Sequence, residues 1–69
     1  MEDFGTKLLI LLKEKGWTYE DLARKAFISK TEISLYIRKG VLPRADYLAF
    51  ICKALDVSAD YLLGLRDER

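Results

Sequence analysis

Histidine is absent from this chain of 69 residues, and cysteine occurs once, as Cys52. Histidine is the most common general base and a frequent metal ligand in proteins, so the chain lacks the side chain on which most such sites depend. A single cysteine forms no internal disulfide, which fits a reducing compartment. Because the acidic and basic residues also form no convergent pair, the sequence predicts neither an enzyme nor a metal or cofactor site.

Long apolar runs and signals for strands are also missing. No stretch reaches the roughly 18 apolar residues of a membrane span. The first residues are acidic rather than basic, with Glu2 and Asp3, which argues against a secretory signal. Apolar residues do not alternate, and no Asn-Gly or Asp-Gly turn occurs, so strands are not expected. The four glycines are assigned to helix ends or turns rather than to a phosphate-binding loop. We therefore expect a cytoplasmic protein with no membrane partner.

Charge is nearly balanced overall, at +1, but it is unevenly distributed. Residues 24–44 carry six basic side chains and one acidic one, whereas the rest of the chain carries six basic and ten acidic. A basic middle on an acidic body suits one-sided contact with a polyanion. A charge run is more often only a solvated surface, so this pattern becomes informative only together with a motif.

Helical spacing of apolar residues fits the whole chain and predicts an all-α, compact five-helix bundle. We assign residues 1–65 to this domain and residues 66–69 to a charged C-terminal tail. The predicted helices span residues 3–15, Tyr19–Ala26, Lys30 to Arg38 or Lys39, Arg44–Leu55 and Ala59–Leu63.

Short polar residues and glycines mark the predicted helix ends. Gly16 and Gly40 are expected to end the first and third helices, and Thr18 to cap the second. Ser29 and Glu32 have the spacing of a capping box, in which the hydroxyl accepts from one free amide and the carboxylate accepts from another.

The stretch from Tyr19 to Arg38 carries the functional signal. Two helices joined by so short a link form a helix-turn-helix, whose second helix enters the DNA major groove. Ala23 is small enough for the two helices to cross closely. The expected apolar anchors of this unit are Leu22, Ala26, Ile28, Ile33 and Tyr36. Side chains left without a core position are mostly short and polar or long and basic, which suits bases and phosphates; they are Lys30, Thr31, Ser34, Leu35 and Arg38.

At this point the chain resembles the phage-repressor and Cro-type, or XRE-like, helix-turn-helix domains over nearly its whole length. The order and spacing of several fragments carry the resemblance: Phe4-Gly5, Lys7-Leu8, residues 13–18, residues 20–23, residues 28–30, Ile33-Ser34, Pro43, Leu48, residues 54–58 and residues 61–64. It implies a lambda-repressor-like fold, a homodimer on a two-fold DNA operator, transcriptional repression as the usual outcome, and a bacterial or phage origin.

The resemblance also implies roles for individual residues. It places Lys30, Thr31, Ser34 and Leu35 over the DNA bases. Leu35 is open to three interpretations, which are contact with a thymine methyl, contact with a neighbouring subunit, or plain exposure. The residues expected near phosphates are Thr18, Tyr19, Ser29, Arg38, Lys39 and Arg44. Ser29 also has the simpler role of a helix cap.

Three features depart from the family pattern. Phe27 occupies a turn position that is often glycine, so the turn is expected to be built differently. Gly40 comes one place later than in many members, which predicts a slightly longer third helix. Leu9, Ile10 and Phe50 are apolar where the family often has charged residues. These three are a candidate dimer or partner surface, with extra core packing as the alternative.

Two alternatives remain open at this stage. The first is a protein-interaction module on the same fold, such as an antitoxin-like or anti-activator partner. The second concerns extent, because the chain could be a stand-alone regulator or the N-terminal domain of a longer one. No small-molecule ligand is expected in so small a core.

Overall fold

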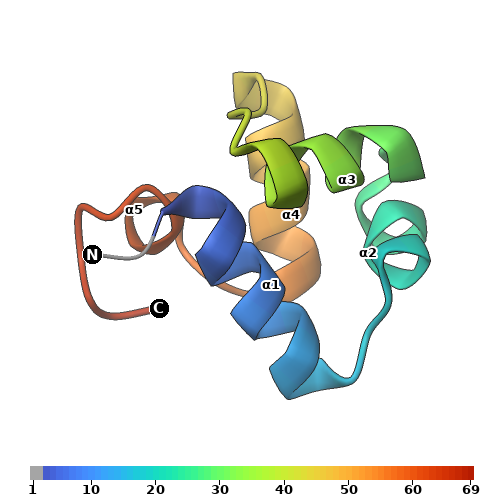
Figure 1. The fold of residues 1–69 in the computed structure, drawn as a ribbon. Coiled ribbons are helices and arrows are strands. Elements are labelled where there is room, and N and C mark those ends of the chain that lie inside the picture. The colour runs from blue at the N-terminus through green and yellow to red at the C-terminus, as the bar shows by residue number, and fades with distance from the viewer. Residues whose placement is uncertain (1–2) are drawn as a thin grey trace.

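The computed structural model describes residues 3–69, which form five α-helices joined by short links (Figure 1). Met1 and Glu2, which belong to the predicted domain, lie outside the described residues. The predicted all-α five-helix fold is confirmed. The helices are α1 (Phe4–Lys15), α2 (Tyr19–Ala26), α3 (Lys30–Lys39), α4 (Ala45–Leu55) and α5 (Ala59–Leu62).

The helix ends lie within one residue of the predicted ones. Asp3 and Arg44 were predicted as first helical residues, but both are N-caps with extended backbone. The Asp3 carboxylate accepts a hydrogen bond from the Thr6 amide at 2.8 Å, which satisfies one free N–H of the first turn. At the other end of the chain, α5 stops at Leu62 rather than Leu63.

Three of the links between helices share one construction. Each begins with a residue of positive φ, continues with an apolar residue and ends with a hydroxyl side chain that caps the next helix. The middle residue donates its amide to a carbonyl five positions earlier, at 2.9, 3.0 and 3.1 Å in the three links. This Schellman arrangement satisfies carbonyls that the preceding helix leaves free. The three links are Gly16-Trp17-Thr18, Phe27-Ile28-Ser29 and Asp56-Val57-Ser58.

The core lies between α1, α2, α3 and α4, with α5 closing one side. Gly5 permits the close crossing of α1 and α3, because a Cβ atom there would lie 2.6 Å from the Tyr36 carbonyl oxygen. Phe4 and Tyr36 meet edge to face beside this crossing, with ring centroids 6.4 Å apart. This contact packs the inner side of α3 against α1, and the other side of α3 faces solvent.

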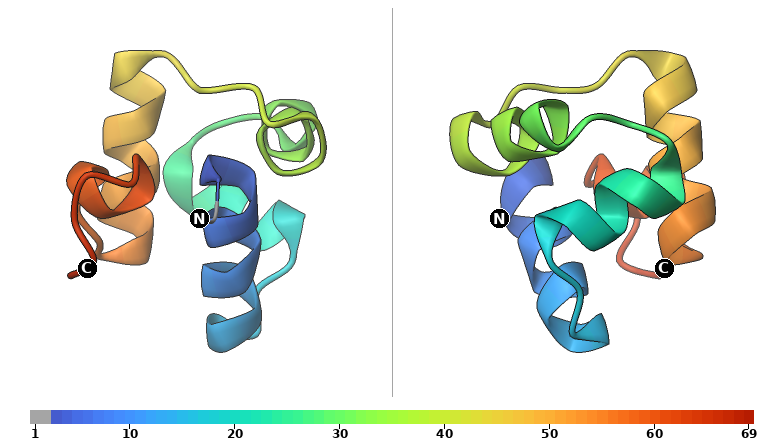
Figure 2. Two further views of the ribbon diagram at one scale, coloured as in Figure 1. Left: turned by 60° about the vertical axis from the view of Figure 1, so that its left-hand side comes forward. Right: turned by 90° about the vertical axis from the view of Figure 1, so that its right-hand side faces the viewer.

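The α3–α4 loop, residues 40–44, arches across one end of the molecule (Figure 2). In the right-hand view α2 lies in front, with α3 on one side of it and α4 on the other. No helix within residues 3–69 has the length and apolar character needed to cross a lipid bilayer.

Lys7 is buried, a position that charged side chains rarely take without a partner. Its ammonium donates to the Tyr61 carbonyl oxygen at 3.0 Å and lies 5.0 Å from the centroid of the Tyr61 ring. These contacts tie α5 to α1. Arg69, in the predicted tail, folds back to pair with Glu14 of α1 at 2.5 and 2.7 Å.

Candidate nucleic-acid interface

The α2–α3 unit is held together by the anchors that the sequence predicted. Leu22, Ala26, Ile28, Ile33 and Tyr36 are all buried. Ala23, buried as well, gives α3 room to cross α2 closely. Because these residues fix the inner sides of both helices, the outward side of α3 has a defined direction.

The capping at the start of α2 is reciprocal. The Thr18 hydroxyl accepts from the Asp21 amide at 3.1 Å, and the Asp21 carboxylate accepts from the Thr18 amide at 2.9 Å. The backbone hydrogen bond from Thr18 holds the pKa of Asp21 below its ordinary value, with a smaller contribution from the neighbouring Arg24.

The capping box predicted for α3 is only half formed. The Ser29 hydroxyl accepts from the Glu32 amide at 3.2 Å, as expected. The Glu32 carboxylate does not return to Ser29, because it accepts from the Tyr36 hydroxyl at 3.1 Å instead. Burial, together with this hydrogen bond, raises the pKa of Tyr36 to about 12. A buried phenol needs a partner, and this need outweighs the second bond of the capping box.

The turn at Phe27 also differs from the prediction. Phe27 adopts the left-handed conformation itself, with φ 59° and ψ 40°, so the turn keeps the geometry that glycine commonly provides. A bulky residue in this conformation carries about 1–3 kcal/mol of strain. The residue is 85% exposed, so little packing within the chain offsets that strain.

All four residues assigned to base reading lie together on the outward side of α3. Lys30, Thr31, Ser34 and Leu35 line one shallow hollow of about 290 Å³, which we call the α3 hollow. None of the four belongs to the core cluster. Gly40 ends α3 with a φ of 71°, so the slightly longer helix expected from its position is observed.

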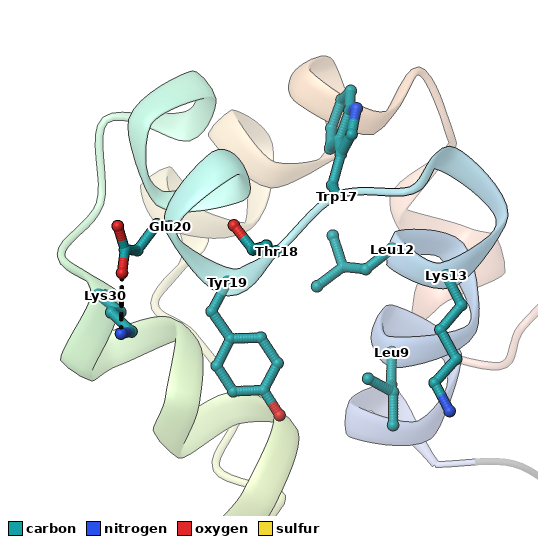
Figure 3. Close-up of a pocket in the computed structure, with 8 residues that line it drawn as sticks. All are labelled: Leu9, Leu12, Lys13, Trp17, Thr18, Tyr19, Glu20 and Lys30. Atoms are coloured by element: carbon teal, nitrogen blue, oxygen red, sulfur yellow. Dashed lines mark hydrogen bonds and ion pairs between the residues drawn. The ribbon is translucent and has the colours of Figure 1, made fainter.

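Lys30 is paired in this structure with Glu20 of α2, at 3.0 Å (Figure 3). Both side chains are well exposed, so the pair contributes little to stability and is easily exchanged. The same two residues border a larger hollow of about 480 Å³ between α1 and α2. Leu9 and Tyr19 project toward it from the two helices (Figure 3). No pattern in the sequence indicated this hollow.

The residues assigned to phosphates differ in their surroundings. Thr18 and Ser29 use their hydroxyl oxygens as acceptors in caps, which leaves each O–H free to donate. Arg38 and Lys39 are exposed in the last turn of α3, and neither pairs with a carboxylate among residues 3–69.

Arg44, by contrast, already has an anionic partner. Its guanidinium donates two hydrogen bonds to Asp46, at 2.6 and 2.7 Å, and lies 4.5 Å from the centroid of the Tyr47 ring. The pair raises the pKa of Arg44 and lowers that of Asp46. Any phosphate that Arg44 binds must compete with this carboxylate.

Comparison with known proteins agrees with the helix-turn-helix arrangement of α2 and α3. The helix-turn-helix family profile matches residues 8–62. An uncharacterized HTH-type transcriptional regulator, YobD of Bacillus subtilis (strain 168), is 37% identical over 62 residues. These cover 90% of this chain and 55% of that protein.

The chain belongs to the helix-turn-helix family.

Two solved structures have a similar fold. The P22 c2 repressor, crystallised with the synthetic operator 9T, gives a TM-score of 0.88 at 26% identity, covering 96% of this chain and all of that one. The N-terminal DNA-binding domain of SinR from Bacillus subtilis gives a TM-score of 0.80 at 32% identity, covering 86% of this chain and 87% of that one. This chain spans about half the length of YobD, the curated relative that it matches.

The three apolar residues singled out as a partner surface do not share one hollow. Leu9 belongs to the hollow between α1 and α2, whereas Phe50 lies on α4 beside Phe27. Leu9 and Ile10 are half-buried, and Phe50 is 38% exposed. The hollow that Phe50 and Phe27 share could not be predicted from the sequence, because the two residues are far apart in the chain and only the packing of α2 on α4 brings them together.

Proposed function

We propose that this chain is a transcriptional repressor that binds double-stranded DNA in a sequence-specific manner, with α3 in the major groove. The observation that carries the proposal is the α3 hollow, in which all four candidate base-reading residues face solvent on one side of a helix held by its other side. The likeness to the P22 c2 repressor, which was solved with an operator, supports it.

The four residues in the α3 hollow offer distinct contacts to base edges. The Lys30 ammonium donates to the acceptors of guanine, and the hydroxyls of Thr31 and Ser34 either donate or accept. Leu35 offers an apolar contact to a thymine methyl. Specificity then depends on these side chains, whereas contacts to the phosphates position the helix.

Phosphate contacts fall to the residues around this helix. Arg38 and Lys39 are available without breaking an ion pair within residues 3–69, whereas Arg44 must leave Asp46. Thr18, Tyr19 and Ser29 add donors from the starts of α2 and α3, where the helix dipole favours an anion. Asp46→Asn should therefore strengthen binding, because it removes the carboxylate that competes for Arg44.

The proposal includes a homodimer on a two-fold operator. Half-sites would lie about 34 Å apart, one turn of DNA, so that two α3 helices reach one side of the duplex. Leu9 and Ile10 are the candidates for contacts between the two copies, whereas Phe50, the third apolar residue of that group, lines a different hollow from Leu9.

The test is selection of bound duplexes from a random pool at two salt concentrations, followed by sequencing. We expect an enriched inverted repeat, and an affinity that falls with salt by about 0.9 logarithmic units per decade for each phosphate contact. A single enriched half-site would support base reading and contradict the dimer. Equal affinity for the enriched and the scrambled duplex at physiological salt would overturn the proposal.

Three variants separate base contacts from phosphate contacts. Ser34→Ala should relax the preference at one base position, at a cost of about 0.5–1.5 kcal/mol for the preferred base, the net worth of one neutral hydrogen bond. Arg38→Ala should weaken all sequences alike and reduce the salt slope by about 1. Lys53→Ala, on α4, is the matched control and should leave both the sequence preference and the slope unchanged. A reporter with the operator placed over its promoter then tests repression.

A further inference from the structure

A second surface of the chain combines backbone strain with exposed aromatic area. Phe27 holds a positive φ while its ring is almost fully exposed. Glycine would take this conformation without strain, and the same position in the α1–α2 link is Gly16. The fold itself therefore gains nothing from the phenylalanine, which points to an interaction outside this chain.

Phe27 does not stand alone. It lines a hollow of about 190 Å³ with Phe50 and Ala54 on α4, and Lys25 and Lys53 form the charged part of the lining. We call these five residues the Phe27–Phe50 hollow. Tyr47 supports Phe50 from the preceding turn of α4, with ring centroids 6.2 Å apart. The hollow shares no residue with the α3 hollow, so its occupant and DNA over α3 use different side chains.

The size and charge of the hollow indicate its occupant. Sites for small molecules typically measure about 300–1,000 Å³, so this volume suits a single anchoring side chain better. Neither Lys25 nor Lys53 pairs with a carboxylate among residues 3–69. Lys25 instead lies over the Trp17 ring, 5.0 Å from its centroid. An apolar floor with two available cations complements an apolar side chain flanked by carboxylates.

We propose that the Phe27–Phe50 hollow docks a segment of a partner protein in which a leucine or aromatic side chain stands beside Asp or Glu. A second copy of this chain fits less well. A two-fold contact through this surface would bring Lys25 and Lys53 of both copies together, and like charges across an interface are unfavourable. The partner is thus a different protein, and its docking site is separate from the proposed DNA surface.

The test uses the full chain and short random peptides displayed on phage. Peptides are selected on immobilised wild-type protein after depletion on Phe27→Gly, and an enriched peptide is then synthesised for fluorescence anisotropy. We expect enriched peptides to carry a leucine or aromatic residue next to acidic residues. Phe27→Gly should weaken binding by about tenfold or more, and Lys25→Glu with Lys53→Glu should abolish it.

Folding is kept separate from docking by the choice of variant. Phe27→Gly relieves the strained backbone, so its thermal unfolding midpoint should rise by about 4 °C while peptide affinity falls. Leu65→Ala is the matched control, because Leu65 is also an exposed apolar residue, at 72%, but lies in the C-terminal segment. This substitution should leave the affinity for the peptide unchanged.

Four results would overturn the proposal. They are enrichment of peptides without acidic residues, equal affinity of wild type and Phe27→Gly, self-association that Phe27→Gly removes, and competition by single-stranded oligothymidylate, which would indicate base stacking instead. DNA selection with wild type and Phe27→Gly distinguishes the two proposals. If both proteins enrich the same operator but bind the peptide equally, this proposal fails and the proposed function stands.

Discussion

The two links that flank α2 follow the same plan but place very different side chains at the same backbone position. The α1–α2 link has Gly16 at φ 71°, and the α2–α3 link has Phe27 at φ 59°. In each link the next residue is apolar and donates to a carbonyl five positions earlier, at 2.9 and 3.0 Å. A hydroxyl then caps the following helix. The apolar residue and the hydroxyl cap therefore determine the geometry of each link. The residue before them only has to tolerate a positive φ.

The largest effect should come from the middle residue of the α2–α3 link. Ile28 is buried and packs in the core, so Ile28→Ala should lower the free energy of unfolding by about 2–5 kcal/mol. Ile28→Val, the conservative control, should cost only about 0.5–1.5 kcal/mol. Urea unfolding followed by circular dichroism measures both. A loss below that of Ile28→Val would show that the buried residue does not hold the link.

The next effect concerns the left-handed position of the α1–α2 link. Gly16→Phe should cost about 0.5–2 kcal/mol, because the strain of the kind that Phe27 carries exceeds the entropy that glycine loses on folding. Apart from the two adjacent residues of the chain, nothing described lies within 4 Å of a Cβ atom at Gly16, so the cost comes from the backbone and not from a clash. Gly16→Asn, which tolerates positive φ better, should cost less. Thermal unfolding of the three proteins checks this order, and equal midpoints would refute the strain argument.

The caps should differ between the two links by a smaller amount. Thr18→Ala breaks a reciprocal pair with Asp21, whereas Ser29→Ala breaks one hydrogen bond. Both should destabilise the chain by about 0.5–2 kcal/mol, with Thr18→Ala at the upper end. The same urea titration compares them. A greater loss for Ser29→Ala would mean that the half-formed box of α3 matters more than the complete one.

The smallest effect should be a gain in stability. Phe27→Gly should add about 0.5–1 kcal/mol, because relief of strain exceeds the entropy that glycine loses on folding. Asp56, at the same position in the α4–α5 link with φ 56°, tolerates positive φ better, so Asp56→Gly should change stability by less. Calorimetry of both variants measures the two changes in the free energy of unfolding. Equal changes would show that Phe27 carries no more backbone strain than Asp56.

The sequence by itself determined the five helices, the caps at Thr18 and Ser29 and the helix-turn-helix, because these depend on spacing and on residues three or four positions apart. The grouping of Lys30, Thr31, Ser34 and Leu35 was predictable for the same reason, since one face of a helix follows from its period. The sequence marked Phe27 as unusual at a position that is often glycine. The local pattern did not decide whether the turn would adopt another backbone geometry or whether Phe27 would adopt the strained left-handed conformation. The rigid packing on both sides of the link settled it.

Only the tertiary structure decided which partner each polar or exposed side chain meets. Lys7 is buried against Tyr61, Lys30 meets Glu20 of another helix, and Glu32 turns to Tyr36. The hollow lined by both Phe27 and Phe50 also depends on how the helices pack. Such contacts join residues on different helices or choose among competing partners, so they depend on how the helices cross. A helical repeat in the sequence gives the direction of a side chain but not its neighbour.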